Sequence, residues 1–124
     1  MNRTVFVIED NEQNLYLVTF LLERKGYIVV SASDGRQALG LVRTIAPAII
    51  LLDIQLPAMD GYAVARALRA EPTLTGIPII AVTSYAMSGD RERALAAGCD
   101  GYIEKPIDPV SFVSEIERFL PQMD

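Results

Sequence analysis

The sequence predicts an α/β fold in which a doubly wound, five-stranded parallel sheet carries helices on both faces, a (βα)5 arrangement. Five short apolar runs alternate strictly with five segments of helical periodicity along the 124 residues. The runs are apolar at successive positions, which is typical of strands buried on both faces. Because five strand-helix units are too few to close an eight-stranded barrel, an open sheet remains.

The strands are predicted where β-branched and aliphatic residues gather in short runs that end at polar or turn-forming residues. One apolar run, residues 48–52, ends abruptly at Asp53. Burying a lone carboxylate is unfavourable unless a cation or a hydrogen-bond donor meets it, so other strand ends should supply partners. The predicted strands are residues 4–8, 27–30, 48–53, 77–83 and 101–103.

The first helix is predicted from Asn11, a suitable N-cap residue, to Lys25, with Gly26 as the residue that follows the C-cap. Its apolar residues form a wider arc than one core-facing stripe requires. Some of them should therefore be exposed to solvent. These apolar residues are Leu15, Tyr16, Leu17, Val18, Phe20, Leu21 and Leu22.

The other four helices are predicted after the second to the fifth strand. The fourth is mostly alanine on its apolar side, so we expect it to be weakly anchored to the sheet. The four helices are expected at residues 38–45 after a turn at Asp34-Gly35, from about Asp60-Gly61 to Leu68, from a Ser88 cap to Ala97, and from about Pro109 to Leu120.

The composition indicates one compact domain spanning residues 1–124, without an attached output domain. Hydrophobic residues make up 51% of the chain and charged residues 22%, which fits a globular protein with a real core. The net charge of -5 and the scattered lysines and arginines argue against nucleic-acid binding. No apolar run is long enough to span a bilayer and no signal peptide is recognisable, so we expect a cytoplasmic protein without membrane insertion.

Two residue types limit the chemistry that the chain can perform. Histidine is absent, which excludes Ser-His and Cys-His nucleophile pairs and the commonest zinc sites. The single cysteine, Cys99, excludes an internal disulfide and is expected to be a small packed hydrophobe.

Polar side chains follow four of the five predicted strands at their carboxyl ends. In an open parallel sheet, ligands bind outside these ends where the strand order reverses. With the flavodoxin-like order 2-1-3-4-5, the polar set converges, and the second strand, which offers only Ser31 and Ser33, lies at an edge. The converging residues are Glu9 and Asp10, Asp53, Thr83 and Lys105.

Three carboxylates in one crevice repel one another, and Lys105 supplies only one positive charge. The remaining negative charge and the oxygen ligands suit a hard divalent cation. Mg²⁺ is usually held by one or two carboxylates together with waters and a phosphate oxygen. A carboxylate beside Mg²⁺, a lysine and a hydroxyl is a competent phosphoryl acceptor, because phosphoryl transfer needs mainly positioning and charge neutralisation.

These motifs resemble the response-regulator receiver domain of two-component signalling over essentially the whole chain. They are Glu9-Asp10, Asp53 within Asp-Ile-Gln-Leu-Pro-Ala-Met-Asp-Gly, Thr83 within Ala-Val-Thr-Ser-Tyr-Ala, and Lys105-Pro106. Within the family, the stretches around Asp53, residues 85–90 and residues 97–107 are similar to DivK-type single-domain regulators and to the receivers of hybrid kinases. Each motif alone is weak, but their order and placement at strand ends are specific.

The resemblance implies a role for each site residue. Asp53 would be the phosphoacceptor, supplied by phosphohistidine on a histidine kinase or a histidine phosphotransfer protein. Asp10, Asp53 and the backbone carbonyl of Gln55 would bind Mg²⁺, with Glu9 acting through a metal-bound water. Lys105 would pair with the phosphoryl oxygens, Thr83 would hydrogen-bond the phosphoryl group, and Tyr102 would turn inward after it.

Further residues receive lesser roles. The Lys105-Pro106 peptide bond resembles one that is cis in the family. Pro57, Gly61 and Pro106 are expected to be structural, and Leu15 and Phe20 on the first helix could dock the phosphodonor or simply cover neighbouring side chains. In this interpretation the chain is a phosphoacceptor that catalyses its own phosphorylation and dephosphorylation rather than a turnover enzyme, and it signals to a downstream protein.

Three alternatives remain open. An aspartate-nucleophile phosphatase of the haloacid dehalogenase type would need an Asp-x-Asp motif, but Gln55 occupies the second position. A flavodoxin-like cofactor module would need a phosphate-binding loop after the first strand, where residues 9–12 would instead repel a phosphate. A receiver-like module that works without phosphorylation would have an eroded acid site, whereas this one is intact.

Overall fold

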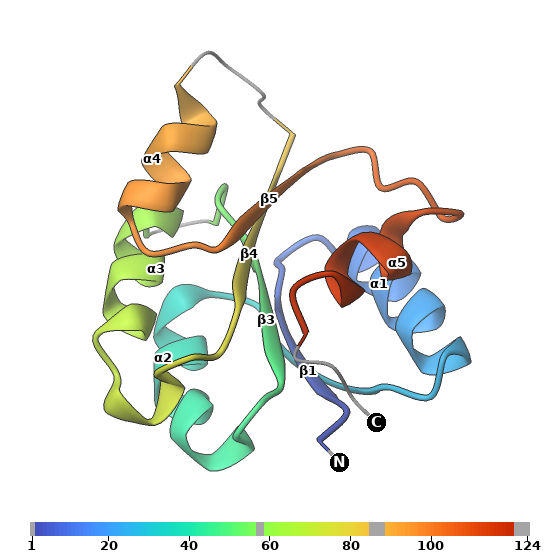
Figure 1. Cartoon of the computed structure of the whole chain (residues 1–124), viewed down its shortest axis with the longest axis horizontal. Coiled ribbons are helices and arrows are strands. Elements are labelled where there is room, and N and C mark those ends of the chain that lie inside the picture. Colours follow the sequence, from blue (N-terminus) through green and yellow to red (C-terminus); the bar gives the residue numbers. More distant parts are fainter. Residues whose placement is uncertain (1, 57–58, 85–88, 121–124) are drawn as a thin grey trace.

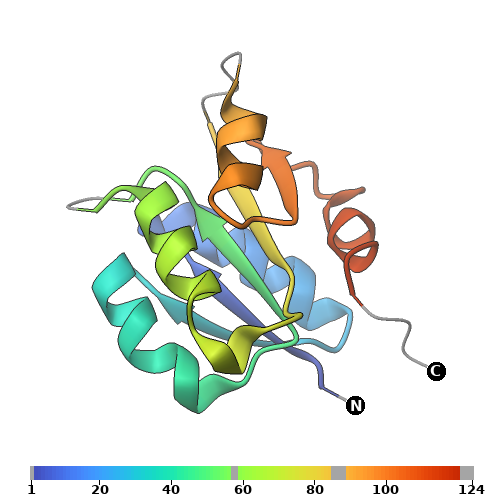
Figure 2. The same cartoon turned by 60° about the vertical axis from the view of Figure 1, so that its left-hand side comes forward.

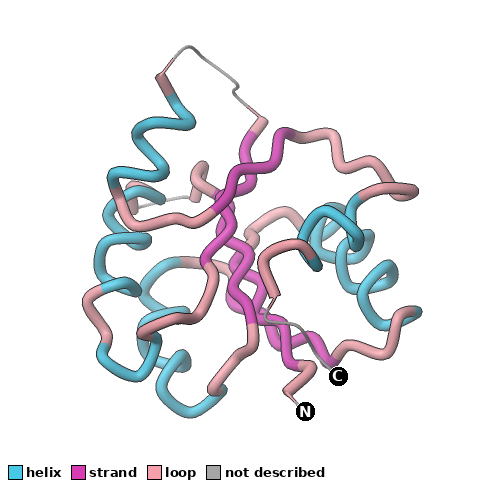
Figure 3. Tube along the Cα trace, viewed as in Figure 1, coloured by secondary structure: helices cyan, strands magenta, loops and turns pink. Residues whose placement is uncertain are grey.

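The computed structural model describes residues 2–56, 59–84 and 89–120. A single parallel sheet lies between two layers of helices (Figure 1). Helices α2, α3 and α4 cover one face, and α1 and α5 cover the other. A view turned by 60° and the tube trace show the same three layers (Figures 2 and 3).

The strand order is β2-β1-β3-β4-β5, and every neighbouring pair is parallel. The predicted fold class is therefore confirmed, including the position of the second strand at one edge. The strands are β1 (Thr4–Ile8), β2 (Ile28–Ala32), β3 (Ile49–Asp53), β4 (Ile79–Thr83) and β5 (Gly101–Glu104). The helices are α1 (Glu12–Arg24), α2 (Gly35–Ile45), α3 (Gly61–Arg69), the short 3₁₀ helix η1 (Pro72–Leu74), α4 (Asp90–Ala96) and α5 (Phe112–Glu117).

The central strands are buried on both faces, as their continuous apolar runs predict. All five residues of β3 and all five of β4 are buried. Alternate side chains of the strands enter two separate cores: Ile50 and Leu52 pack under α2 and α3, whereas Ile49 and Leu51 pack under α1 and α5. Burying side chains of this size stabilises the fold by about 1.5–3 kcal/mol each.

The first helix ends as predicted, but the following strand begins one residue later than predicted. Asn11 caps α1 by accepting a hydrogen bond from the Asn14 N–H at 2.9 Å. At the other end, the N–H groups of Gly26 and Tyr27 donate to carbonyls of the last turn, and Gly26 has φ +87°. Because the Tyr27 N–H serves the helix, β2 runs from Ile28 to Ala32 and not from Tyr27 to Val30.

Two other boundaries differ from the prediction for local hydrogen-bonding reasons. Asp34-Gly35 is not a separate turn, because the Asp34 carboxylate accepts a hydrogen bond from Gln37 N–H at 2.7 Å and caps α2, which begins at Gly35. The last helix begins at Phe112 rather than near Pro109, because Asp108 accepts bonds from Val110 N–H and Phe112 N–H and forms a turn there. The predicted Ser88 cap and Pro57 lie outside the described residues.

Gly61 is required by a close approach, in addition to its place at the start of α3. Its N–H donates to the Ile54 carbonyl at 3.2 Å, so the two backbones touch. A Cβ at Gly61 would overlap the Cα and carbonyl of Ile54, which are backbone atoms that cannot turn away. The loop that follows the Asp53 strand is thereby fixed against the helix that it leads into.

We therefore expect Gly61→Ala to lower the free energy of unfolding by about 1–3 kcal/mol, as overpacking does. Urea denaturation measures the change. Gly40→Ala is the matched control, since a Cβ at Gly40 on α2 meets no atom within 4 Å. That control should be neutral or stabilising by up to about 1 kcal/mol. Equal stability changes in the two variants would contradict the close approach.

Candidate functional site

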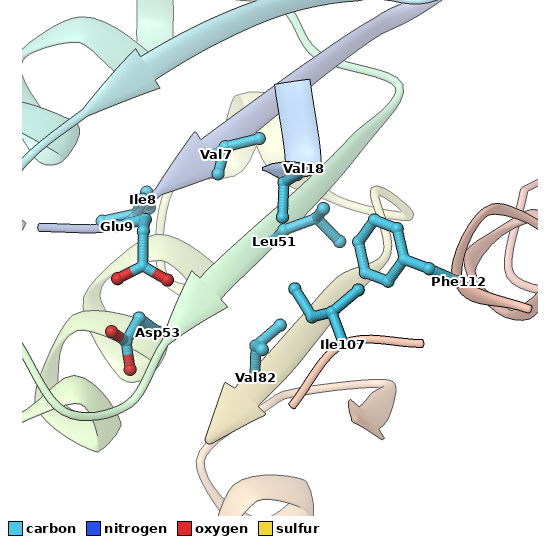
Figure 4. A pocket seen from close by; sticks show the side chains of 9 residues that line it. All are labelled: Val7, Ile8, Glu9, Val18, Leu51, Asp53, Val82, Ile107 and Phe112. Carbon is cyan, nitrogen blue, oxygen red and sulfur yellow. The ribbon is translucent and has the colours of Figure 1, made fainter. Parts of the chain in front are cut away.

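The carboxyl ends of β1 and β3 lie side by side and bring acids together from distant parts of the sequence. Ile8 pairs with Leu52 across the two strands, so Glu9 and Asp10 follow one strand where Asp53 ends the other. Figure 4 shows the Glu9 and Asp53 side chains facing each other beyond the strand tips, with apolar side chains behind them. The sheet topology alone creates this juxtaposition.

The three carboxylates form one cluster that can hold a metal ion. One oxygen from each of Glu9, Asp10 and Asp53 lies within 4.8 Å of the other two. Glu9 and Asp53 are buried, with 5% and 4% of their surface exposed, whereas Asp10 is exposed to solvent. A cation could thus enter from the Asp10 side.

Lys105 reaches the cluster from the end of β5. Its Nζ lies 2.9 Å from Glu9 Oε1 and 3.3 Å from Asp53 Oδ2, and all three side chains are nearly inaccessible to solvent. Burial lowers the pKa of Lys105, but the two carboxylates outweigh burial, so its pKa is raised. Lys105 is therefore a fixed positive charge between the Glu9 and Asp53 carboxylates.

Glu9 is held in an environment that favours its protonated form. Burial, a hydrogen bond with Asp53 and the Asp53 charge raise the pKa of Glu9, while Lys105 and the Asn11 N–H lower it. The balance places the pKa of Glu9 at about 7. A proton on Glu9 thus offsets part of the excess of the three carboxylates over the single Lys105, and a bound cation could take the place of that proton.

Gln55 joins Asp53 to the end of the neighbouring strand. Its backbone N–H donates to Asp53 Oδ1 at 2.8 Å, and its side-chain Oε1 accepts a hydrogen bond from the Ser84 N–H at 3.1 Å. The Nε2 atom of Gln55 is buried, and none of the residues that the structure describes accepts a hydrogen bond from it. The bond to Ser84 was not predicted, because nothing in a sequence shows where a long side chain will lie.

Thr83 is the last residue of β4, which lies next to β3. Asp53 pairs with Val82, so Thr83 lies one residue further toward the carboxyl ends of the strands than Asp53 does, and its side chain is buried. The Lys105 N–H donates to the Thr83 carbonyl at 2.8 Å, which ties the end of β5 to the end of β4. Tyr102 is half-buried on β5, opposite Ala81.

The remaining predicted residues lie near the carboxyl ends of the strands or on α1. The Lys105-Pro106 bond is cis, as the resemblance implied. Leu15 is half-buried and packs on the core beneath α1, whereas Phe20 is 46% exposed. Phe20 stacks on Tyr16, which is 73% exposed, at a centroid distance of 6.5 Å. The expectation that part of the wide apolar arc is exposed is confirmed.

Comparison with known proteins identifies the family. The model of the response regulator receiver domain matches residues 5–117. The chain belongs to the receiver-domain family. It is 42% identical over 120 residues to the polar-differentiation response regulator DivK of Brucella ovis, covering 97% of this chain and 98% of that protein, and it is equally similar to DivK of Brucella abortus.

Solved receiver structures have the same architecture. The receiver domain of a sensor histidine kinase from Pseudomonas aeruginosa, whose structure has a magnesium ion coordinated in the active-site cleft, is 34% identical and superposes with a TM-score of 0.86 over 96% of this chain and 98% of that chain. The chemotaxis response regulator CheY4 of Vibrio cholerae is 26% identical with a TM-score of 0.90 over 97% and 100% of the two chains.

Membership of this family establishes the general role of the chain. Receiver domains are phosphorylation-activated switches of two-component signalling that bind Mg²⁺ in an acidic pocket and receive signals from histidine kinases or phosphotransfer proteins. They act as phosphoacceptors rather than as turnover enzymes. Within the residues that the structure describes, no helix is long and apolar enough to cross a membrane.

The raised pKa of Glu9 predicts a pH dependence in metal-free buffer containing EDTA. Between its ordinary value of 4.5 and about 7, folded Glu9 retains a proton that the unfolded chain has lost. Its stabilising contribution is therefore full below pH 4.5 and is lost as the pH rises through 7. Relative to Glu9→Gln, the wild-type free energy of unfolding should fall across this range by on the order of 2 kcal/mol.

Urea denaturation at a series of pH values measures this difference. Glu23→Gln, which removes an exposed carboxylate from α1, is the matched control and should follow the wild-type profile. Parallel profiles for the wild type and Glu9→Gln would show that Glu9 titrates as an ordinary carboxyl.

Proposed function

We propose that Asp53 is the phosphoacceptor of this receiver domain and that phosphorylation switches its contacts with other proteins. The observation that supports this assignment best is the surroundings of the buried Asp53 carboxylate. Lys105 Nζ lies 3.3 Å from one of its oxygens, and two further acids lie beside it at the carboxyl end of the sheet. A carboxylate so placed has a fixed cation where the charge of an incoming phosphoryl group develops.

The transfer is an in-line displacement at phosphorus. A carboxylate oxygen of Asp53 forms the new P–O bond as the P–N bond of phosphohistidine breaks, and the departing imidazole takes up a proton from solvent. The Gln55 N–H, 2.8 Å from Asp53 Oδ1, holds the carboxylate in place, and Lys105 neutralises part of the phosphoryl charge. In dephosphorylation, water attacks phosphorus, the bond to Asp53 breaks and inorganic phosphate leaves.

The acidic cluster suits Mg²⁺. Asp10 and Asp53 with the carbonyl of Gln55 would hold the ion, and Glu9 would act through a bound water, which agrees with oxygens spread over as much as 4.8 Å. When bound, the ion would neutralise oxygens of the transferring phosphoryl group. The short contact between Glu9 and Lys105 leaves Asp10 as the acid most accessible to an arriving cation.

Thr83 and Tyr102 are proposed as the switch residues. Thr83 is buried one residue beyond Asp53 along the edge, within the region that a phosphoryl group would occupy. A new dianionic group there would make contacts in a second arrangement that it does not make in the present one. These contacts would shift Thr83, Tyr102 and α4 toward that second arrangement. Pro106 would shape the loop that follows β5.

The partners follow from the same proposal. The phosphodonor would be a histidine kinase or a histidine phosphotransfer protein that docks on α1, where Phe20 is exposed and Leu15 packs beneath it. Residues 1–124 would form one receiver domain that acts in the cytoplasm, and the phosphorylated domain would pass its signal to a downstream protein by contact. An unpaired, buried Cys99 is compatible with that location.

A phosphatase of the aspartate-nucleophile type is the weaker alternative. Its general acid/base would occupy position 55, where this chain has an amide whose Oε1 is already bonded to the Ser84 N–H. A module that signals without phosphorylation would not need Lys105 together with two buried acids and an exposed one at the same end of the sheet. Neither alternative has an observation that favours it over the phosphoacceptor.

We expect incubation with Mg²⁺ and acetyl phosphate to add one phosphoryl group to the wild type, detected by intact-mass spectrometry. Asp53→Asn should reduce the adduct at least a hundredfold, because the nucleophile is gone, and EDTA should suppress it in the wild type. Asp100→Asn is the control: Asp100 lies at the opposite end of the sheet, and its replacement should leave the adduct unchanged. Equal adduct in Asp53→Asn and wild type would overturn the assignment.

Phosphorylation should also change positions far from Asp53. We expect the ¹H–¹⁵N NMR signals of α4 and β5 to shift when the adduct forms, because a bistable element transmits the new charge. Thr83→Ala should form the adduct yet reduce these distant shifts, since the hydroxyl that contacts the phosphoryl group is lost. Shifts confined to residues around the acid cluster in the wild type would contradict a switch.

A further inference from the structure

The first turn of α4 carries a carboxylate enclosed by side chains. Asp90 exposes only 14% of its side chain, although it is the first residue of a surface helix. The Tyr62 hydroxyl of α3 donates a hydrogen bond to Asp90 Oδ1 at 3.4 Å. Arg93 Nη1 lies 3.7 Å from the same oxygen, and its guanidinium covers the Tyr62 ring at 4.5 Å. We refer to Tyr62, Asp90 and Arg93 as the α3–α4 clamp.

The charge of Asp90 also acts on Tyr102 of β5. Burial raises the pKa of Tyr102, and the charges of Asp90 and then Glu104 raise it further. Burial likewise raises the pKa of Tyr62, followed by the charge of Asp90, with Arg93 opposing and a smaller contribution from Tyr102. The hydrogen bond from Tyr62 and the contact with Arg93 fix the Asp90 carboxylate between α3 and α4.

Other anchors of α4 are few. Ala94 is the buried residue of this seven-residue helix, and Gly89 at its N-cap supplies no side-chain hydrogen bond. Figures 1 and 2 show α4 next to α3 and packed beside β5. A buried alanine methyl contributes little compared with a larger aliphatic side chain, so polar contacts at the first turn carry much of the attachment.

We propose that Asp90 is a positioning residue that holds the start of α4 against α3 in the arrangement seen here, and so opposes the change that phosphorylation of Asp53 induces. This inference rests on the proposed function. A movement of α4 away from α3 would separate both Asp90 and Arg93 from Tyr62. A contact that exists in only one of two arrangements shifts the equilibrium toward that arrangement by the whole free energy of the contact. An intact clamp thus opposes activation.

Beryllium trifluoride with Mg²⁺ is the probe, since its fluorines stand in for phosphoryl oxygens on an acceptor carboxylate. Removing the clamp should make binding more favourable, because the competing arrangement is destabilised. Titration followed by NMR should show about three- to tenfold tighter binding to Asp90→Ala and to Tyr62→Phe, the range for the loss, from one of two states, of a hydrogen bond of ordinary net strength, which suits the 3.4 Å length. Tyr62→Phe keeps the ring beneath Arg93 and is the milder change.

Glu92→Ala is the matched control. Glu92 is an exposed acid in the same first turn, so its removal takes the same charge from the same helix end without touching the clamp. Its affinity for the probe should equal that of the wild type. Equal affinities in Asp90→Ala, Tyr62→Phe and Glu92→Ala would overturn the inference. If Asp90→Ala fails to fold, Tyr62→Phe decides alone.

Two further measurements separate the possible failures. Without the probe, the α4 backbone signals of Asp90→Ala and Tyr62→Phe should move toward their positions in probe-bound wild type, a change that loss of helix stability alone would not produce. Unmoved signals would contradict the positioning role. Absence of probe binding to the wild type, or binding undiminished in Asp53→Asn, would instead overturn the proposed function.

Discussion

The structure depends on how negative charge is accommodated at the ends of two central strands. Asp53 and Glu9 are almost completely buried and Asp10 lies beside them, while Lys105 is the cation within reach among the described residues. Burial and mutual repulsion both disfavour three ionised carboxylates, which is why Glu9 has a raised pKa. The three carboxylates therefore outnumber the single lysine, and a bound cation would stabilise the site.

The order of the strands brings the charged and polar groups of the site together. The order β2-β1-β3-β4-β5 places β3 between β1 and β4, so the acceptor strand has the acids on one side and Thr83 on the other. Lys105 follows β5, and its side chain crosses the end of β4 to reach Asp53. The strand without functional residues, β2, lies at the edge. An order that placed another strand between β1 and β3, or between β3 and β4, would separate these groups.

The sequence predicts the fold and the residues at the strand ends, because apolar runs and polar strand tips are local signals. It predicts less well where a backbone N–H has two possible partners. Tyr27 reads as a strand residue, but its N–H bonds to the last turn of α1. Long side chains are the second limit: the Gln55 amide bonds to Ser84, and Asp90 meets Tyr62, across loops and elements that no periodicity describes.

The same contacts show why a change at Asp53 need not remain local. Asp53 is bonded to the Gln55 N–H, and the Gln55 side chain is bonded to the residue after Thr83. The Thr83 carbonyl accepts from Lys105, whose ammonium touches Asp53 and Glu9. These bonds close a ring through the ends of β3, β4 and β5. A group added to Asp53 would therefore act on the ends of all three strands and not on β3 alone.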